Sequence, residues 1–452
     1  MKKIFTLTLV IFIILNTFAS CAYLDKMPAS KKVRDDESGL DFYPLPDGTY
    51  GVSAGDTIYD EKVIIPSEFN GKDVTQILHN AFEDCQALKE IVIPESITTV
   101  GDYAFNNCTY LELSQIPKGV TYIGDYAFRG CNSITELIFP DSSLALGKSS
   151  FSTCVNLKSI DFGNGLTNVG YGAFSHCDGV TEIEIGGAVE SIEPYAFYGC
   201  SNLTDVTVAD SVVSICDRAF YNCTALKNLN LGKGLQSIDS YAFHSCSELA
   251  SVNIPAGVNY IGDRAFYNCN SLSSITVDDD SLTYRSIDGN LYSKDGSVLV
   301  RYAAGKGEMM FVIPEAVTQI GSCAFENCNN LMNVDIGENV VSIGDCAFYN
   351  SNGISDITIP YAVESIGFNA FANCGYLGYV KFENVDQWIA RYDFDVDDGR
   401  EFEASELMDE NSAADYLGNL YRDYYWVRGP RESSLDEFED FEELEEFEED
   451  VD

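Results

Sequence analysis

The feature that most constrains this chain is a phenylalanine that recurs at a fixed interval of 23 residues. Nine copies, Phe82 to Phe266, follow one another without a slip, and after a single longer gap the series resumes with three more at the same interval, which makes twelve. A period of this length over most of a chain predicts a solenoid with one coil per repeat, and therefore a binding function exerted over an extended surface. The repeated residues are Phe82, Phe105, Phe128, Phe151, Phe174, Phe197, Phe220, Phe243, Phe266, Phe325, Phe348 and Phe371.

Each repeat carries further apolar residues at fixed distances from its Phe. The position five residues before it, beginning with Ile77, and the position six residues after it, beginning with Leu88, are apolar in every copy. Nine and eleven residues after it the side chains are nearly always apolar, as in Ile91 and Ile93, which indicates a short strand with one face inward. Coils stacked at ~4.8 Å would bury each ladder of equivalent residues and join the strands into a parallel sheet.

This pattern resembles the leucine-rich repeats of the BspA type, a family of bacterial and protist surface proteins. The resemblance is carried by runs such as 100–108 (Val-Gly-Asp-Tyr-Ala-Phe-Asn-Asn-Cys) and 249–255 (Leu-Ala-Ser-Val-Asn-Ile-Pro), and it covers about residues 50 to 380. It implies a right-handed, leucine-rich-repeat-like coil of mostly β and irregular structure. It also implies a cell-surface protein without enzymatic activity, since members are associated with adhesion to extracellular-matrix proteins and to other bacteria.

The N-terminus is typical of an export signal, because two lysines precede an apolar run from Ile4 to about Ala19. The motif Phe-Ala-Ser-Cys at 18–21 resembles a bacterial lipobox, in which the Cys is acylated after cleavage. We therefore expect a signal peptide over residues 1–21, a lipid on Cys21, and contact with the membrane only through that lipid. Ordinary secretion and an uncleaved membrane anchor are the alternatives. No later apolar run is long enough to cross a bilayer.

The remaining organisation follows from where the period begins, breaks and ends. The gap between Phe266 and Phe325 equals one coil plus an insertion, in which Ile287-Asp288-Gly289 favours a projecting β-hairpin. In the N-terminal cap we expect strands near 48–52 and 63–66 and a tight turn at Asn70-Gly71. The expected segments are a tether at 22–40, an N-terminal cap at 41–78, repeats at 79–382 with an insertion at about 279–314, a C-terminal cap at 383–434 and an acidic tail at 435–452.

The chain is strongly acidic, with a net charge of −44 at pH 7. After residue 382, 26 acidic residues face only five arginines, and Asp and Glu make up two thirds of the segment 435–452. This balance excludes nucleic acid as a partner, because the phosphate backbone would be repelled. It favours basic patches on partner proteins or a divalent cation such as Ca²⁺, with solubility as the simpler explanation. The tail is expected to be solvated and disordered or, alternatively, to dock on a basic partner.

Fifteen cysteines in an exported chain normally suggest disulfides, but eleven of them occupy the position three residues after the Phe. That position predicts a ladder of buried thiols, although neighbouring coils would also bring the residues within disulfide reach. Ser351 fills the position in a twelfth coil. Cys323 and Cys346 share a different position on adjacent coils, which we expect to be exposed, and they are candidates for a disulfide. No Cys and His grouping has metal-ligand spacing, so no metal site is expected.

The outward side chains of the predicted strands lie eight and ten residues after each Phe. They are mostly acidic, amide or hydroxyl residues, with no basic residue before Lys381, and twelve strands would form a strip ~60 Å long. Such a strip suits a basic protein segment or a hydroxyl-rich glycan, unless the positions are polar only because they face water. The candidate ligand-binding residues are Glu90, Glu136, Asp161, Glu182, Glu184, Asp205, Asn228, Asn230, Asp335 and Asp356.

Tyrosines form two further rows, which would either stack on sugars or protein partners or shield the corner of the core. These residues are Tyr103, Tyr126, Tyr195 and Tyr241 in one row and Tyr198, Tyr221, Tyr267 and Tyr349 in the other. Catalysis is not expected, because His79, His176 and His244 lie in different coils and no nucleophile motif is present. The leading hypothesis is a surface protein that binds host or bacterial surface proteins in the manner of an adhesin. The alternatives are an envelope or host carbohydrate-binding protein and a self-associating surface layer.

Overall fold

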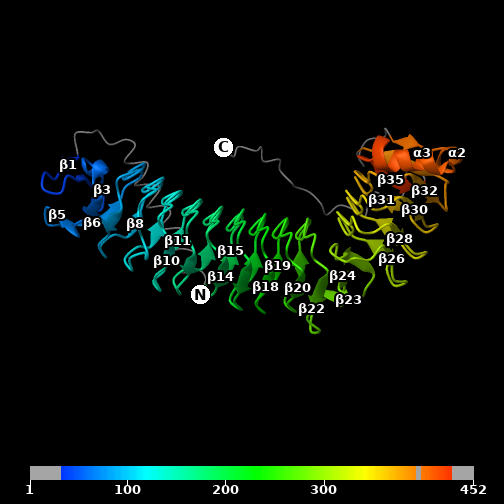
Figure 1. Ribbon diagram of the computed structural model, residues 1–452, viewed down its shortest axis with the longest axis horizontal. Helices are drawn as coiled ribbons and strands as arrows, with labels where there is room; N and C mark the ends of the chain where they lie inside the picture. The colour runs from blue at the N-terminus through cyan, green and yellow to red at the C-terminus, as the bar shows by residue number, and fades with distance from the viewer. Residues whose placement is uncertain (1–31, 393–398, 430–452) are drawn as a thin grey trace. The chain divides into compact units, whose positions relative to one another are not determined.

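The computed structural model of the chain describes residues 32–392 and 399–429. The predicted lipobox at Cys21 and the acidic tail at 435–452 lie outside the described residues. The described chain divides into two compact units, the first formed by residues 32–294 with 303–306 and the second by 295–302, 307–392 and 399–429. Within each unit the coils stack side by side in chain order (Figure 1). The predicted solenoid of 23-residue coils, about fourteen in number, is confirmed.

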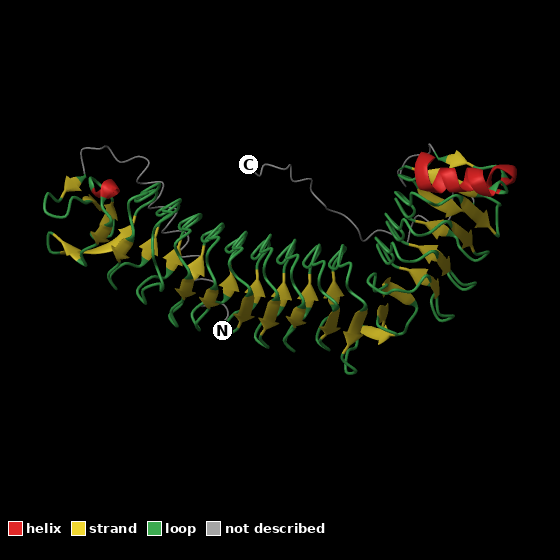
Figure 2. Cartoon of the chain, in the orientation of Figure 1, coloured by secondary structure: helices red, strands yellow, loops and turns green. Residues whose placement is uncertain are grey.

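Most coils contribute two short parallel strands, joined by loops and turns (Figure 2). One strand begins eight residues after the Phe, and we call this series the long-strand row. The other occupies the positions six and five residues before the Phe, and we call it the short-strand row. In unit 1 the long-strand row consists of β4 (Lys62–Ile64), β7 (Glu90–Val92), β10 (Glu136–Ile138), β12 (Ser159–Asp161), β14 (Glu182–Ile185), β16 (Asp205–Val208), β18 (Asn228–Asn230), β20 (Ser251–Ile254) and β22 (Ser274–Val277). The short-strand row consists of β8 (Thr99–Val100), β9 (Tyr122–Ile123), β11 (Ala145–Leu146), β13 (Asn168–Val169), β15 (Ser191–Ile192), β17 (Ser214–Ile215), β19 (Ser237–Ile238) and β21 (Tyr260–Ile261).

In both rows, residues that pair between neighbouring coils of the Phe series are 23 positions apart in the sequence. Val206 of β16 lies opposite Leu229 of β18, and Ile192 of β15 lies opposite Ile215 of β17. An insertion within a coil would shift this register, which explains why the interval stays constant. The sequence predicted the long-strand row. It did not predict the short-strand row as strands, because only two residues per coil pair there.

The long-strand row is not one continuous ladder. Its hydrogen-bonded groups in unit 1 contain two or three strands each, such as β10 with β12 and β14 with β16 and β18. The segment 112–117 occupies the position of the long strand in its coil but forms no strand. It contacts its neighbours through two isolated bridges, Glu90 with Glu112 and Gln115 with Ile138. The expectation of a single twelve-strand strip is therefore wrong. The row is interrupted within unit 1, and unit 2 carries its own set of strands.

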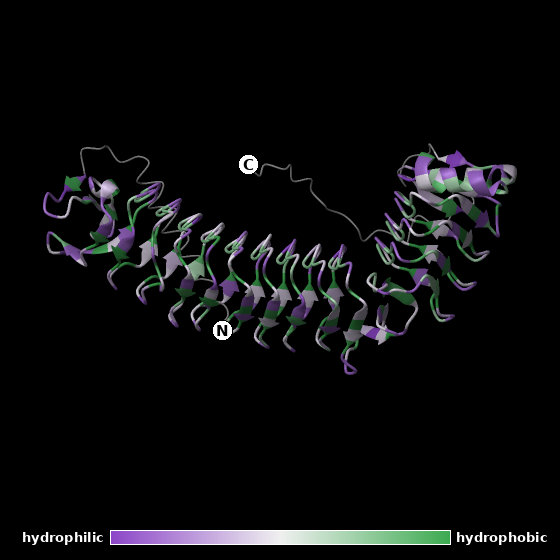
Figure 3. Cartoon of the chain, viewed as in Figure 1, coloured by the Kyte–Doolittle hydropathy of each residue, from purple (hydrophilic) through white to green (hydrophobic). Residues whose placement is uncertain are grey.

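The repeated phenylalanines form the centre of each coil stack. In unit 1 neighbouring rings lie nearly parallel with centroids 5.0–5.7 Å apart, as between Phe197 and Phe220 at 5.2 Å. Every one of these rings is almost completely buried, and hydrophobic segments recur coil after coil in Figure 3. Around the ring the backbone is bonded to the next coil, since the amide of Phe82 donates to the carbonyl of Ala104 at 2.7 Å. The Phe ladder therefore fixes both packing and coil spacing.

The cysteines three residues after the Phe are buried thiols, as expected. The structure adds a role that the sequence did not show: the Cys200 Sγ donates a hydrogen bond to the Phe174 carbonyl of the preceding coil at 3.2 Å. Ser351 makes the equivalent bond from its hydroxyl to Phe325 at 2.6 Å. Burial raises the pKa of Cys200 to about 12, so the reactive thiolate is strongly disfavoured.

Two positions in the coil adopt a left-handed backbone conformation, two residues before and two residues after the Phe. At the first position φ is positive for non-glycine residues of very different kinds, including Tyr103 at 55°, Arg218 at 53° and Cys323 at 57°. The second position is often Asn, as in Asn107 at 63°. Left-handed backbone is unfavourable for such side chains, and the bonds between coils offset the cost.

The glycine four residues before the Phe does not have a positive φ. At Gly101 the space is restricted, because a Cβ would lie 2.6 Å from the backbone nitrogen of His79.

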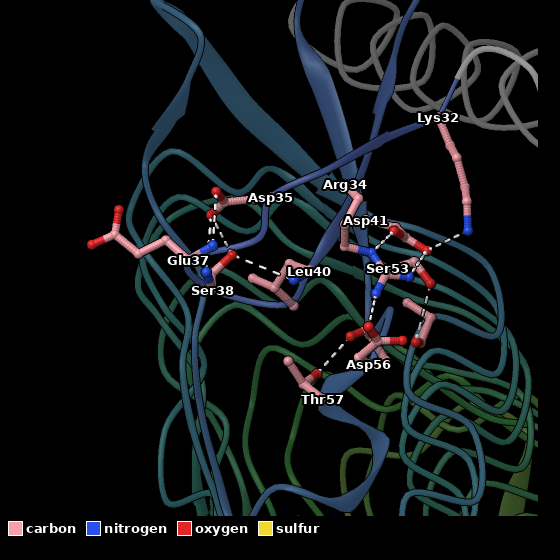
Figure 4. Close-up of polar contacts among 12 residues, drawn as sticks. Lys32, Arg34, Asp35, Glu37, Ser38, Leu40, Asp41, Ser53, Asp56 and Thr57 are labelled. Atoms are coloured by element: carbon pink, nitrogen blue, oxygen red, sulfur yellow. Dashed lines mark hydrogen bonds and ion pairs between the residues drawn. The ribbon is translucent and has the colours of Figure 1, made fainter.

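The N-terminal cap begins earlier than the sequence predicted, because residues 33–40 belong to it and not to a tether. Leu40 is 1% exposed, and the Asp41 carboxylate is buried against Arg34 and Lys32, with Arg34 also reaching Asp56 (Figure 4). Burial opposes ionisation of Asp41, but the Arg34 and Lys32 cations hold its pKa below the ordinary value. The cap elements are β1 (Val33–Arg34), β2 (Asp41–Pro44), β3 (Tyr50–Ser53), η2 (Thr57–Tyr59), β5 (Glu68–Phe69) and β6 (Lys72–Ile77), with Asn70-Gly71 turning between β5 and β6.

The insertion contains the expected hairpin and also one coil that the Phe pattern did not reveal, which we call the hidden coil. Strands β23 (Tyr284–Ile287) and β24 (Asn290–Ser293) pair antiparallel around Asp288-Gly289 in unit 1. In unit 2, Tyr302 occupies the Phe position one period before Phe325, stacks on it at 5.4 Å and donates its amide to Ala324. The turn before Tyr302 is two residues shorter than in other coils. The buried Arg301 guanidinium donates instead to the Cys323 and Glu326 carbonyls.

Unit 2 continues the coils and ends in a mixed cap around two buried tryptophans. Trp388 and Trp426 are each 1% exposed, and the strands that carry them pair antiparallel. This cap lies in the segment expected to form a C-terminal cap, and it contains both strands and short helices. The elements are β25 (Val298–Arg301), β26 (Met310–Val312), β27 (Gln319–Ile320), β28 (Asn333–Asp335), β29 (Ser342–Ile343), β30 (Asp356–Ile359), β31 (Ser365–Ile366), β32 (Tyr379–Phe382), β33 (Trp388–Arg391), β34 (Arg400–Glu401), α2 (Ala404–Leu407), α3 (Glu410–Asp415), η3 (Tyr416–Leu420) and β35 (Tyr425–Arg428).

Candidate functional site

The ten candidate residues all lie in the long-strand row with their side chains outward. The alternation in β14, where Glu182 and Glu184 are exposed and Ile183 and Ile185 are buried, is the pattern that places them there. Nine of the ten are exposed, and Asp205 is half-buried. Eight belong to unit 1, whereas Asp335 and Asp356 belong to unit 2. The structure thus places each candidate on a solvent-facing surface but divides them between the two units.

Five carboxylates of unit 1 form what we call the acidic zone: Glu136, Asp161, Glu182, Glu184 and Asp205. Strand register places Ile138, two residues after Glu136, opposite Asp161, and Glu182 opposite Asp205. The two groups of strands adjoin, because β12 and β14 are in contact without forming a ladder. Among residues 32–392 and 399–429, no hydrogen bond or ion pair engages the carboxylates of Glu136, Glu182 and Glu184. These three side chains are therefore charged and available to a partner.

The later part of the row in unit 1, from β18 to β22, carries no charged outward side chain, and hydrogen bonds join its side chains. The Asn228 amide donates to Asp205 at 2.6 Å, and the Thr276 hydroxyl donates to Asn253 at 2.9 Å, each acceptor lying in the preceding coil. Hydrogen bonds from Thr204 and Asn228 hold the pKa of Asp205 below its ordinary value. Asn228 and Asn230 therefore serve partly to join coils, and the charge of the row is concentrated in the acidic zone.

The structure corrects the expectation that no basic residue interrupts the row before Lys381. Lys62 of β4 lies in the same row, and its Nζ is 2.5 Å from the Glu90 carboxylate. Glu90 therefore carries its own counter-ion and is a weaker candidate than the acidic zone. The reason it was missed is that β4 precedes the first Phe, so the repeat frame did not include it.

Apolar side chains on the outward positions are a second feature that the sequence analysis overlooked. Ile64, Val92 and Ile138 in unit 1 are 59%, 42% and 45% exposed. In unit 2, Met310 and Val312 of the hidden coil are 63% and 56% exposed. Exposed apolar groups on neighbouring coils often mark interaction surfaces. Met310 and Val312 lie eight and ten residues after Tyr302, and this spacing could have identified them as outward positions.

A shallow depression of about 490 Å³ borders the acidic zone. It lies where the coil at 112–117 forms no strand, so neighbouring coils leave an open hollow. Its lining combines apolar, amide and charged side chains, including those of Gln115, Lys118, Ile138, Asp141, Asp161 and Asn164. The depression offers a partner a concave contact on the outward surface.

The tyrosine rows of unit 1 form a stacked band along one corner of the coils. Tyr198 and Tyr221 stack at 5.0 Å, and the Tyr221 ring lies 4.2 Å from the His244 ring. The Arg218 guanidinium sits between Tyr195 and Tyr241, 5.6 and 4.6 Å from their centroids. Because neighbouring side chains cover the ring faces, the band shields the core corner and leaves little face for a sugar to stack on.

His244 lies inside this band and gives unit 1 a predicted pH dependence. Burial, together with the charges of Arg264 and Arg218, lowers the pKa of His244 to about 4. Between pH 6.5 and 4 the unfolded chain therefore binds a proton that the folded chain does not. We expect this group to contribute about 1–2 kcal/mol of stability above pH 6.5, lost as the pH falls to 4. Urea unfolding at pH 7 and 4.5 should show a smaller pH effect in His244→Gln than in wild type; equal effects would contradict it.

Metal and disulfide chemistry receive no support from the described residues. Within residues 32–392 and 399–429, no group of three or more His, Cys, Asp or Glu side chains is arranged to hold a metal ion. The sequence predicted that Cys323 and Cys346 are exposed, but Cys323 is only 7% exposed and Cys346 is half-buried. Both are free thiols in the structure. The disulfide between them stays a prediction, which mass spectrometry of the unreduced, alkylated protein would decide.

The fold and its polar outward row define the class as a leucine-rich-repeat solenoid of the kind that serves as a binding scaffold. The chain belongs to the BspA type leucine rich repeat region family, whose sequence profile matches residues 75–200, 167–295 and 309–396. Proteins with these repeats are typically found at the cell surface. Over residues 32–392 and 399–429, no helix has the length and apolar character needed to cross a membrane.

Of two similar solved structures, the first supports the fold. A leucine-rich repeat protein from Bacteroides ovatus is 24% identical, with 77% of this chain and 94% of that chain covered and a TM-score of 0.54. A leucine rich cell surface protein from Faecalibacterium prausnitzii is 23% identical, with 79% of this chain and 89% of that chain covered and a TM-score of 0.48. No curated protein is similar enough in sequence to be matched.

Proposed function

We propose that this chain is an adhesin-like cell-surface module that binds host or bacterial surface proteins through the exposed face of its long-strand row. The observation that carries the proposal is the acidic zone, whose carboxylates face solvent on a rigid array of coils with three of them unengaged. Exposed apolar side chains on the same face and membership of a family of surface repeat proteins support it. Export with a lipid on Cys21 would place this surface outside the cell.

The test is binding of the full-length exported chain to a panel of extracellular-matrix and bacterial surface proteins by surface plasmon resonance. The variant carries Ala at four acidic-zone positions: Glu136, Glu182, Glu184 and Asp205. We expect at least a tenfold loss of affinity for the bound partner, because charged groups at an interface set both encounter rate and register. Affinity that is unchanged in the variant would contradict the proposal. Repeating the binding with Ca²⁺ and with a chelator would decide whether the cation contributes.

Carbohydrate binding remains the second candidate, and one observation favours it: the neutral stretch of the row is rich in amides and hydroxyls, including Asn228, Asn230 and Asn253. The stacked tyrosine band offers it less support, because its ring faces are covered. A glycan array with the same chain separates the two candidates. Strong binding to a neutral glycan that survives removal of the four carboxylates would favour carbohydrate recognition.

A further inference from the structure

The acidic zone and the depression beside it share one face of unit 1, which no other described element covers. We propose that they form a docking surface for an extended, basic segment of a partner protein that also carries one apolar side chain. This inference rests on the proposed function and deepens it, because it assigns the partner's chemistry and the part of the surface that reads it. Charge, apolar exposure and spacing each support it.

The charge of the surface is decidedly negative. Glu95 and Asp141 line the depression and join the five carboxylates of the acidic zone. One basic residue, Lys118, also lines the depression, and Lys158 directly precedes β12, so the surface carries seven carboxylates and two ammonium groups. Because a bound segment should present the opposite potential, it should be rich in Lys or Arg.

The same surface has an apolar component. Ile138 lines the depression, is 45% exposed and pairs in register with Asp161. Val92, 42% exposed, occupies the equivalent outward position two coils earlier. Single exposed apolar residues are common on protein surfaces, but Ile138 lies in a hollow beside the acidic zone, where an apolar side chain of a partner can contact it. A side chain seated in a concave, partly apolar hollow is the usual anchor of a protein interface.

Spacing sets the pattern expected in the partner. Glu182 and Glu184 alternate along β14, so their Cβ atoms are separated by ~6.8 Å. Alternate residues of an extended segment have the same separation, so cationic side chains at alternate positions match the two carboxylates. The hollow at Ile138 is two strand steps away, ~10 Å, from this pair. The hollow lies across the coils from this pair and not along β14, so the partner segment turns after its alternating basic residues and places its apolar residue a few positions away.

The experiment measures fluorescence anisotropy of a fluorescein-labelled peptide, Ser-Leu-Ser-Arg-Ser-Arg-Ser-Arg-Ser, with the full-length exported chain. We expect binding that weakens when the salt concentration rises and that is lost when Glu replaces each Arg. Replacing the peptide's Leu by Ser, or Ile138 by Ser in the protein, should each weaken binding about threefold to tenfold. The variant E136K/E182K/E184K should weaken it at least tenfold, ~1.4 kcal/mol or more.

The matched control is E190K/E248K/D263K, which changes the net charge by the same amount at exposed positions outside the long-strand row. It should weaken binding less than about twofold. Equal losses in both triple variants would show general charge attraction and overturn the inference, as would unaltered binding in E136K/E182K/E184K. A peptide that does not bind, while a surface protein binds the chain and loses affinity in the variant with Ala at Glu136, Glu182, Glu184 and Asp205, would refute this inference and leave the proposed function intact. A panel without any protein ligand, with a neutral glycan bound instead, would refute both.

Discussion

Replacing Phe220 by Ala should destabilise unit 1 by about 3–5 kcal/mol. The ring is completely buried and stacks between Phe197 and Phe243 at 5.2 and 5.3 Å. Truncation leaves a cavity that the neighbouring rings cannot fill, because both are held at the coil spacing by their own backbone bonds. Urea unfolding followed by circular dichroism measures the effect, since Trp388 and Trp426 lie in unit 2 and do not report on unit 1.

Two variants control this prediction. Phe220→Leu keeps most of the volume and should cost less than the truncation to Ala. Tyr110→Ala removes an aromatic ring that is 57% exposed and should change stability by less than about 0.5 kcal/mol. If Phe220→Ala unfolds at the same urea concentration as wild type, the Phe ladder does not hold the coils together.

The second large effect is expected in the cysteine ladder. Cys200→Val should cost about 1–3 kcal/mol, because the hydrogen bond to the Phe174 carbonyl is lost and a bulkier side chain enters a close-packed position. Cys200→Ser should cost less than Cys200→Val, because a hydroxyl can make the same bond, as Ser351 does to Phe325. The comparison is again by urea unfolding of both variants.

The outcome of that comparison separates two roles for the thiols. If the Ser variant is the less stable of the two, packing of the sulfur outweighs its hydrogen bond. Alkylation of the native protein gives an independent readout, since the buried thiols should react only after unfolding. Rapid labelling of Cys200 in the folded chain would contradict the burial and raised pKa described above.

The sequence predicted the coil because the residues that face its interior recur once in every repeat. The Phe, the Cys and the two apolar ladders recur in register, and burial at these positions is nearly complete. The hidden coil escaped because Tyr302 replaces Phe and Arg301 replaces Ala, with the Arg301 side chain substituting for backbone donors. Because the Arg301 side chain takes the place of part of the turn, this coil lacks the residues that recur in the other coils.

Backbone conformation was predictable at one of the two left-handed positions. Asn at the position after the Phe, as in Asn222 and Asn268, is a residue that tolerates this conformation and so indicates it. At the position before the Phe, Tyr241 and Arg264 give no such indication. There the conformation is imposed by bonds to the next coil, such as Tyr241 N to the Asp263 carbonyl at 3.1 Å, which only the assembled stack supplies.

For the candidate site, the sequence identified which positions face outward but not how they are grouped. The alternation that exposes Glu182 and Glu184 is local, whereas the counter-ion of Glu90 comes from Lys62, 28 residues earlier in the cap. The depression exists because one coil, 112–117, departs from the strand pattern and exposes its neighbours. Such features depend on contacts between coils and were therefore not predictable from one repeat.

The central claim is that inward residues hold the solenoid while outward residues bind. The most direct measurement is the affinity for the bound surface protein and the urea midpoint, determined together for two proteins. These are the variant with Ala at Glu136, Glu182, Glu184 and Asp205, and Phe220→Leu. We predict that the first loses affinity at least tenfold with an unchanged midpoint, and that the second keeps its affinity with a lower midpoint. Full affinity in the first variant, with its fold intact, would contradict the account.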